Sequence, residues 1–306
     1  MVFNIDVDEN NWSKEVFSQL LTDKTTNRNI IWATSDYETV GLEYGSQYPI
    51  LYENITGANS DIIKPRVLKS KENQGNRTKD KAEVFTPSWV CNYQNNLIDE
   101  SWFGRENVFN IGVNQSWSTV KEKIEFPKVD NKSWQDYVNE KRLEITCGEA
   151  PYLVSRYDSV TGNPIELNDR IGLLDRKMRV VAENTDSEME WINWSKKAFE
   201  SIYGFEFQGD SLLLARENLL ATYVDYYRAK LDRNPTDSEL LDIATIISWN
   251  IWQMDGLKFT IPYQTVRSPD EQLSFLDSDY NQTEKFCIIK DWITNEIFLF
   301  KDLVNK

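Results

Sequence analysis

The stretch Leu143-Glu144-Ile145-Thr146-Cys147-Gly148-Glu149-Ala150-Pro151-Tyr152 decides the fold, because in it a short buried strand is expected to run straight into a turn that contains glycine. Two further apolar stretches, residues 203–207 and 250–255, also have the composition of core strands. Long segments with the apolar spacing of helices separate the three. Strands that alternate with helices predict an α/β fold, with a mainly parallel sheet and helices on both faces.

Helices are predicted where apolar residues recur every three or four positions. Thr236 and Glu239 have the spacing of a capping box, in which each side chain satisfies a backbone donor at the start of a helix. A hairpin that turns at Thr294 and Asn295 is predicted for residues 286–300. The predicted helices span residues 169–181, 188–202, 212–229 and 237–247.

Residues 1–81 are predicted to form an N-terminal extension of mixed α+β structure, and residues 82–306 to form the main domain. A short helix through Val16 is expected to be capped by Asn10 or Ser13. Residues 29–32 favour a strand, and residues 49–52 favour one more weakly.

The segment 64–81 differs sharply from the rest, because lysine and arginine gather there among polar residues. This composition predicts a mobile basic loop. One interpretation is a solvated loop, and the other is a segment that contacts DNA phosphates. For the second, the candidate contacts are Lys69, Lys71, Arg77 and Lys79.

The overall composition predicts a cytoplasmic globular protein. Hydrophobic residues make up 40% of the 306 residues and charged residues 27%, which allows a packed core. No apolar run is long enough for a membrane span, and the acidic first residues do not resemble a signal peptide. Cys91, Cys147 and Cys287 are widely spaced, as expected in a reducing compartment, and predict neither disulfides nor a metal site.

Two features of the charged residues limit the possible functions. The chain has no histidine, which excludes serine–histidine and cysteine–histidine catalysis and the histidine-containing zinc sites. Its net charge of −15 repels phosphate, so DNA binding by the chain alone is expected to be weak. This acidity is most simply a solubility feature, while imitation of DNA is an alternative.

Polar residues follow each of the three predicted strands. In open α/β sheets, ligands bind where parallel strands end. Gly148 allows the backbone to approach a ligand closely, Glu206 can accept hydrogen bonds from a ribose diol, and Asp255 can accept one from an adenine amino group. These residue types in this order indicate a site for a cofactor that contains adenosine.

Four segments, in this order, resemble the DNA adenine-N6 methyltransferases of restriction-modification systems. They are EVFTP (residues 83–87), EITCGEAPYL (144–153), YGFEF with LLLARENLL (203–220) and NIWQMDGLK (250–258). The family pattern is [G/A]-E-x-F-T-P, then D-P-A-x-G-x-G-x-F/Y-L, then G-I-D/E-I with A-R-x-N-L, then N-I-x-x-G-D-x-L. The resemblance covers residues 64–300 and implies a Rossmann-like sheet that binds S-adenosylmethionine.

The resemblance also implies a role for individual residues. Glu206 corresponds to the ribose ligand and Asp255 to the adenine ligand. The segment over the methionine end of the cofactor corresponds to Phe85, Thr86 and Pro87. The cofactor turn corresponds to Glu144, Thr146, Cys147, Gly148 and Ala150.

The sequence departs from the family pattern in three places. Ala150 replaces the second glycine of the turn, Ile145 replaces its proline, and Glu149 adds a negative charge. The catalytic tetrapeptide, Asn/Asp/Ser-Pro-Pro-aromatic, is missing. Residues 260–263 (Thr-Ile-Pro-Tyr) are the closest local match, and they lack the amide or acid and one proline.

We therefore expect the cofactor-binding part of such a methyltransferase, split or truncated and inactive alone. A second subunit is expected to supply the catalytic tetrapeptide and target recognition. The alternative is a non-catalytic regulatory protein, or an acidic DNA mimic, on the same fold.

Overall fold

Three parallel strands form the sheet around which the chain folds. β5 (Arg142–Glu144), β6 (Ile202–Glu206) and β7 (Ile251–Gln253) lie in the order β5-β6-β7. Gly204 of β6 is aligned with Glu144 on one side and with Ile251 on the other. The fold is thus mixed α/β with a parallel sheet, as predicted, and the three strands end at one edge.

The computed structural model describes residues 12–81, 86–128, 132–264 and 285–304. The helices are α1 (Lys14–Leu21), α2 (Tyr52–Ile55), α3 (Lys71–Lys81), α4 (Ser88–Phe103), α5 (Trp134–Asn139), α6 (Leu173–Asn184), α7 (Glu188–Glu200), α8 (Gly209–Leu231), α9 (Asp237–Asn250) and α10 (Phe300–Val304). Three antiparallel hairpins consist of β1 (Thr22–Asp23) with β2 (Arg28–Asn29), β3 (Asn110–Val113) with β4 (Ser116–Thr119), and β8 (Ile288–Lys290) with β9 (Ile297–Leu299). No helix among these residues is long and apolar enough to cross a membrane.

The two faces of the parallel sheet are covered differently. Ile202 and Ile251 point into the main core, which contains apolar side chains of α6, α7, α8 and α9. Tyr203, Phe205 and Trp252 point to the other face, where they pack against the hairpin β8–β9 and α10. Helices were predicted on both faces of the sheet, but the long helices α6, α7, α8 and α9 cover one face only. The strand order advances in one direction, and right-handed crossovers then place both helical connections on the same side.

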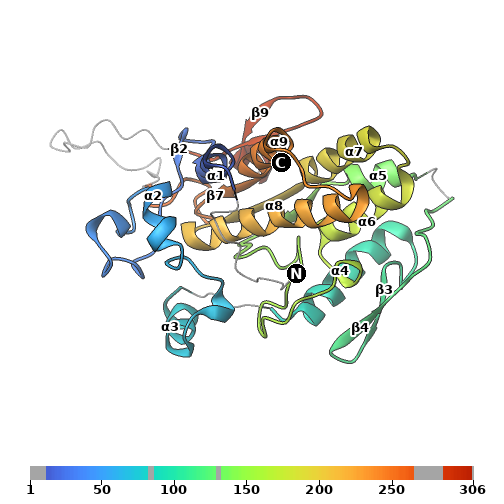
Figure 1. Ribbon diagram of the computed structural model, residues 1–306, viewed down its shortest axis with the longest axis horizontal. Coiled ribbons are helices and arrows are strands. Elements are labelled where there is room, and N and C mark those ends of the chain that lie inside the picture. The colour runs from blue at the N-terminus through green and yellow to red at the C-terminus, as the bar shows by residue number, and fades with distance from the viewer. Residues whose placement is uncertain (1–11, 82–85, 129–131, 265–284, 305–306) are drawn as a thin grey trace.

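The N-terminal residues pack onto the same core. α1 begins after Ser13, whose side chain accepts a hydrogen bond from the nitrogen of Val16 (3.5 Å), and α1 packs along α9. Trp32 and Ile50 are fully buried in the core that α8 and α9 share. Figure 1 shows the long helix α8 crossing the middle of the molecule, with α3 below one of its ends.

The segment predicted as a basic loop is helical. Residues Arg66–Leu68 form a 3-10 helix and residues Lys71–Lys81 form α3. The helix has no apolar stripe, so hydrophobic spacing gave no sign of it. Contacts made by its charged side chains hold it, as described below.

Candidate functional site

The carboxyl ends of the strands are joined by backbone and carboxylate contacts. The nitrogen of Gly148 donates to Oε2 of Glu206 (2.9 Å), and the nitrogen of Cys147 donates to the carbonyl of Phe205 (2.9 Å). The nitrogen of Met254 donates to the carbonyl of Glu206 (2.9 Å). Gly148 and Glu206 are thus brought together, and Asp255 follows directly after the contact between β6 and β7.

The turn after β5 has an unusual backbone. Thr146, Gly148 and Ala150 all have positive φ, at 47°, 53° and 63°. This left-handed region favours glycine, because a Cβ atom there lies too close to backbone oxygen. Ala150 is nevertheless fully buried at the position where the resemblance predicts a second glycine. The turn therefore has left-handed geometry at Thr146 and Ala150 without glycine there.

Two buried carboxyl groups lie beside this turn. Glu144 accepts hydrogen bonds from the nitrogens of Tyr152 (3.3 Å) and Leu153 (3.2 Å). Burial raises the pKa of Glu144 to about 8, although these hydrogen bonds act to lower it. Burial likewise raises the pKa of Glu206, against the hydrogen bonds donated by the nitrogens of Gly148, Phe207 and Gln208. Among the described residues, neither carboxyl group is paired with a cation.

Asp255 lies in a tight turn after β7. Its Oδ1 accepts hydrogen bonds from the nitrogens of Leu257 (3.0 Å) and Lys258 (3.2 Å). Its side chain is 18% exposed, with the amine of Lys258 3.8 Å from Oδ2. Asp255 therefore keeps an accessible carboxylate oxygen at the edge of the sheet where β5 and β6 also end.

A cavity of about 380 Å³ opens beside the turn. Its lining includes five of the predicted cofactor residues, namely Thr86, Glu144, Thr146, Cys147 and Gly148. Ala150, Glu206 and Asp255 are not in that lining, Pro87 precedes α4 as its cap, and Phe85 lies outside the described residues. The structure thus brings half of the predicted residues to one hollow.

Residues 64–81 are tied to this edge at two points. Glu149, which is buried, accepts hydrogen bonds from the nitrogen of Arg66 (2.7 Å) and the hydroxyl of Tyr157 (2.7 Å). Asp210, at the start of α8, is paired with Lys69 (3.2 Å) and Arg77 (2.9 Å). We call Lys69, Arg77 and Asp210 the latch.

Two of the four predicted phosphate contacts, Lys69 and Arg77, are instead paired with Asp210 in the latch. Arg77 is only 3% exposed, and it also bonds Asp36 (2.5 Å) and Gln208 (2.7 Å). Lys69 is mostly buried by its contact with Asp210, while Lys71 and Lys79 are exposed. Two of the four predicted contacts therefore hold the fold, and the other two are exposed side chains.

The closest match to the missing tetrapeptide has a structural role. Thr260 is fully buried and forms bridges to both Asp255 and Phe286. Tyr263 is 44% exposed and packs edge-on against Phe207. Thr260 thus pairs backbones beneath the sheet edge, and its side chain is closed to a substrate.

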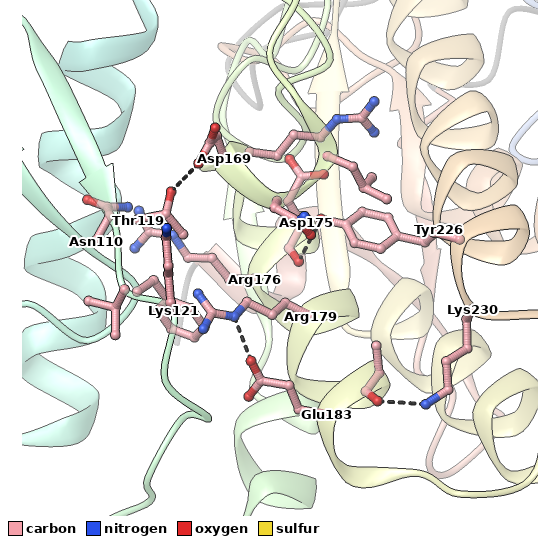
Figure 2. Close-up of a pocket in the computed structure, with 17 residues that line it drawn as sticks. Asn110, Thr119, Lys121, Asp169, Asp175, Arg176, Arg179, Glu183, Tyr226 and Lys230 are labelled. Carbon is pink, nitrogen blue, oxygen red and sulfur yellow. Dashed lines mark hydrogen bonds and ion pairs between the residues drawn. The ribbon is translucent and has the colours of Figure 1, made fainter.

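A larger cavity of about 540 Å³, which the sequence did not predict, lies between the hairpin β3–β4 and the helices α6 and α8 (Figure 2). Its charged side chains are used within the chain: Arg179 bonds Glu183 (2.7 Å), and Lys230 bonds the carbonyls of Ala182 (2.7 Å) and Thr185 (2.9 Å). The hydroxyl of Thr119 bonds Asp169 (2.6 Å) across the mouth. These contacts join α6 to α8 and the hairpin to Asp169, so we place the candidate site at the sheet edge despite its smaller cavity.

Comparison with known proteins gives no independent guide to the site. No family model, no curated protein and no solved structure matches the chain. No group of acidic or cysteine side chains in the described ranges is arranged to hold a metal ion.

Proposed function

We propose that this chain is the S-adenosylmethionine-binding part of a DNA adenine-N6 methyltransferase of a restriction-modification system. The observation that carries the proposal is the left-handed turn of Thr146, Gly148 and Ala150, with Gly148 bonded to Glu206 at the carboxyl edge of a parallel sheet. Such an edge is where α/β proteins bind nucleotide-like ligands. The order of the four motifs in the sequence agrees with this placement.

The side chains at the edge have the chemistry that this cofactor needs. A carboxylate offers about four acceptor sites. Backbone N–H groups of Gly148, Phe207 and Gln208 occupy three of these sites on Glu206, so about one site remains for a ribose hydroxyl. Oδ2 of Asp255 lies 3.8 Å from the amine of Lys258 and can also accept from an adenine amino group. The buried carboxyl groups of Glu144 and Glu206 favour a cationic ligand, and the sulfonium of S-adenosylmethionine is one.

Calorimetric titration with S-adenosylmethionine tests the pocket. Asp255→Ala is expected to weaken binding by about 1–3 kcal/mol, because a buried adenine amino group loses its acceptor. Asp302→Ala, an exposed acid in α10, is the matched control and should bind as the native chain does. Absence of binding by the native chain, or equal binding by Asp255→Ala, would show that the pocket is wrongly placed.

These 306 residues are expected not to methylate DNA by themselves. An exocyclic adenine amine is a poor nucleophile, and the family activates it with the side chain and carbonyl acceptors of the tetrapeptide that this sequence lacks. Loss of one such preorganised group costs on the order of a hundredfold to a thousandfold in rate. Transfer of a labelled methyl group to unmethylated DNA measures this, and robust transfer by this chain alone would contradict it.

A non-catalytic regulatory protein on the same fold is the second candidate. The observation in its favour is that Glu149 and Glu206 are largely occupied by donors of the chain itself. On this alternative the turn is a structural remnant, and the titration with S-adenosylmethionine gives no heat of binding.

A further inference from the structure

One border of the parallel sheet carries backbone groups that pair with none of the described residues. In a parallel ladder, alternate residues of a strand bond the neighbouring strand. Arg142 donates to the carbonyl of Ser201 (2.9 Å), so Arg142 and Glu144 face β6. The N–H groups of Leu143 and Ile145 point the other way, and no described residue accepts from them.

The side chains along this border are apolar and exposed. Leu143 is 46% exposed and Ile145 66%. On the neighbouring helix α4, Leu97 is 48% exposed and Ile98 37%. Natural edge strands are usually protected by charge, proline or a covering segment, so an apolar open edge indicates a site for another strand.

A hollow of about 610 Å³ lies between β5 and α4 along the open border. Its lining is mixed, with apolar Leu97, Ile98 and Trp102 beside Ser101, Lys132, Glu140 and Arg142. It shares Ile98 with the cavity proposed for the cofactor, whose lining includes Leu143 and Ile145.

The opposite border of the sheet is closed by the chain itself. The side chain of Gln253 in β7 accepts from the nitrogen of Ile31 (2.9 Å) and donates to its carbonyl (2.8 Å). The thiol of Cys287 donates to the carbonyl of Gln253 (3.4 Å). The openness of β5 is therefore a local property of that strand and not of the sheet as a whole.

We propose that an extended segment of a basic partner protein docks on β5 and adds a strand to the sheet. The free N–H groups require an extended backbone, and the exposed apolar side chains of β5 and α4 favour a segment with alternating apolar side chains. The net charge of −15 opposes a second copy of this chain and favours a cationic partner. This inference deepens the split-enzyme part of the proposed function by naming where the second subunit docks, and it needs no bound cofactor.

The probe is a short synthetic peptide in which lysine alternates with isoleucine or valine. Its binding to the full chain, without cofactor, is followed by residue-resolved hydrogen exchange. We expect the amides of Leu143 and Ile145 to exchange at least about tenfold more slowly with peptide, as new hydrogen bonds form. Absence of binding at millimolar peptide, or protection elsewhere with none at these two amides, overturns the proposal.

Leu143→Pro is the sharpest variant, because it removes an outward N–H and leaves the bonds of Arg142 and Glu144 to β6 in place. We expect it to fold and to bind the peptide about tenfold more weakly, whereas Leu143→Val keeps the N–H and binds normally. Equal binding by Leu143→Pro and the native chain overturns strand addition.

A second peptide keeps the test decisive if that variant does not fold. N-methylation of the alternate amides that face β5 blocks pairing, so binding of the native chain should fall by about tenfold or more. Replacement of every lysine by glutamate should weaken binding similarly, and equal binding of the acidic peptide overturns the basic partner. If sedimentation shows that the native chain is a dimer and that Leu143→Pro is not, the edge pairs with a second copy of the chain. That result also overturns the proposal. A failed titration with S-adenosylmethionine leaves these outcomes unchanged, so the two hypotheses are tested separately.

Discussion

The turn after β5 and the latch at the start of α8 lie at the same edge of the sheet, yet they stabilise their carboxyl groups in opposite ways. In the turn, Glu144 and Glu206 are buried among backbone N–H donors, and burial raises the pKa of both. In the latch, Asp210 is equally buried, but Lys69 and Arg77 hold its pKa well below the usual range. Glu206 and Asp210 are only four positions apart in the chain.

The difference shows what a buried carboxylate needs. Backbone dipoles offset part of the cost of removing a charge from water, whereas an adjacent cation reverses the balance. In the latch the charge of Asp210 is balanced by Lys69 and Arg77, so these groups hold the fold. The turn lacks a positive charge among the described residues, which is a reason to place the binding of a cationic ligand there and not at the latch.

Breaking the latch should have the largest effect. Arg77→Ala leaves the charge of Asp210 buried with Lys69 as its one remaining cation in the described contacts, beside the hydroxyl of Tyr37, and we expect the free energy of unfolding to fall by about 3–5 kcal/mol. Lys79→Ala, an exposed change on the same helix, should alter it by less than about 0.5 kcal/mol. Urea denaturation of the two variants makes the comparison, and similar losses in both would mean that the Arg77 contacts do not hold α3.

Because no described cation is paired with the buried carboxyl groups beside the turn, the free energy of unfolding should depend on pH. The folded pKa of Glu144 is about 8 and its ordinary value is 4.5, so the folded chain holds an extra proton between these values. The free energy of unfolding should therefore fall as pH rises from 5 to 8, by up to about 1.4 kcal/mol per pH unit. Asp210 is ionised throughout this window, and no histidine titrates in it.

Glu144→Gln should make that slope shallower, while Glu38→Gln, an exposed change, should leave it as in the native chain. Glu206 contributes to the slope with the same sign, since its pKa is also raised. Urea denaturation at a series of pH values gives the slope. A flat profile for the native chain would contradict the raised pKa of both carboxyl groups.

The same proton should affect the proposed cofactor. A cationic ligand favours the ionised form of Glu144, so binding at neutral pH should release a proton. Affinity for S-adenosylmethionine should then rise by up to about tenfold per pH unit below pH 8. Titration in two buffers of different ionisation enthalpy detects the released proton, and Glu144→Gln should abolish the release.

Local patterns in the sequence predicted the elements that position the turn. The capping box of Thr236 and Glu239 is present at the start of α9, and the predicted strands at residues 203–207 and 286–300 are found as β6 and the hairpin β8–β9. These elements depend on neighbouring residues, so their signals lie within a few positions of the chain.

The parts that could not be predicted depend on distant contacts. α3 is held by Arg77 through residues more than a hundred positions away, such as Asp210, and its own sequence has no apolar stripe. The bond of Glu149 to the nitrogen of Arg66 likewise joins segments far apart in the chain. Strand order decides which face the helices cover, and no local pattern carries that information.

The smallest expected effect concerns the backbone of the turn. The left-handed φ of Ala150 costs about 1–2 kcal/mol, and glycine removes that cost. Glycine also gives the unfolded chain more freedom, which costs about 0.5–1 kcal/mol. Both Ala150→Gly and Ala198→Gly, which lies in the right-handed helix α7, also remove a fully buried methyl group, which costs about 0.8 kcal/mol. Because only Ala150 has the left-handed φ, Ala150→Gly should lower the free energy of unfolding by about 1–2 kcal/mol less than Ala198→Gly does. Urea denaturation of the two variants measures this difference, and equal losses would mean that the backbone at Ala150 is not strained.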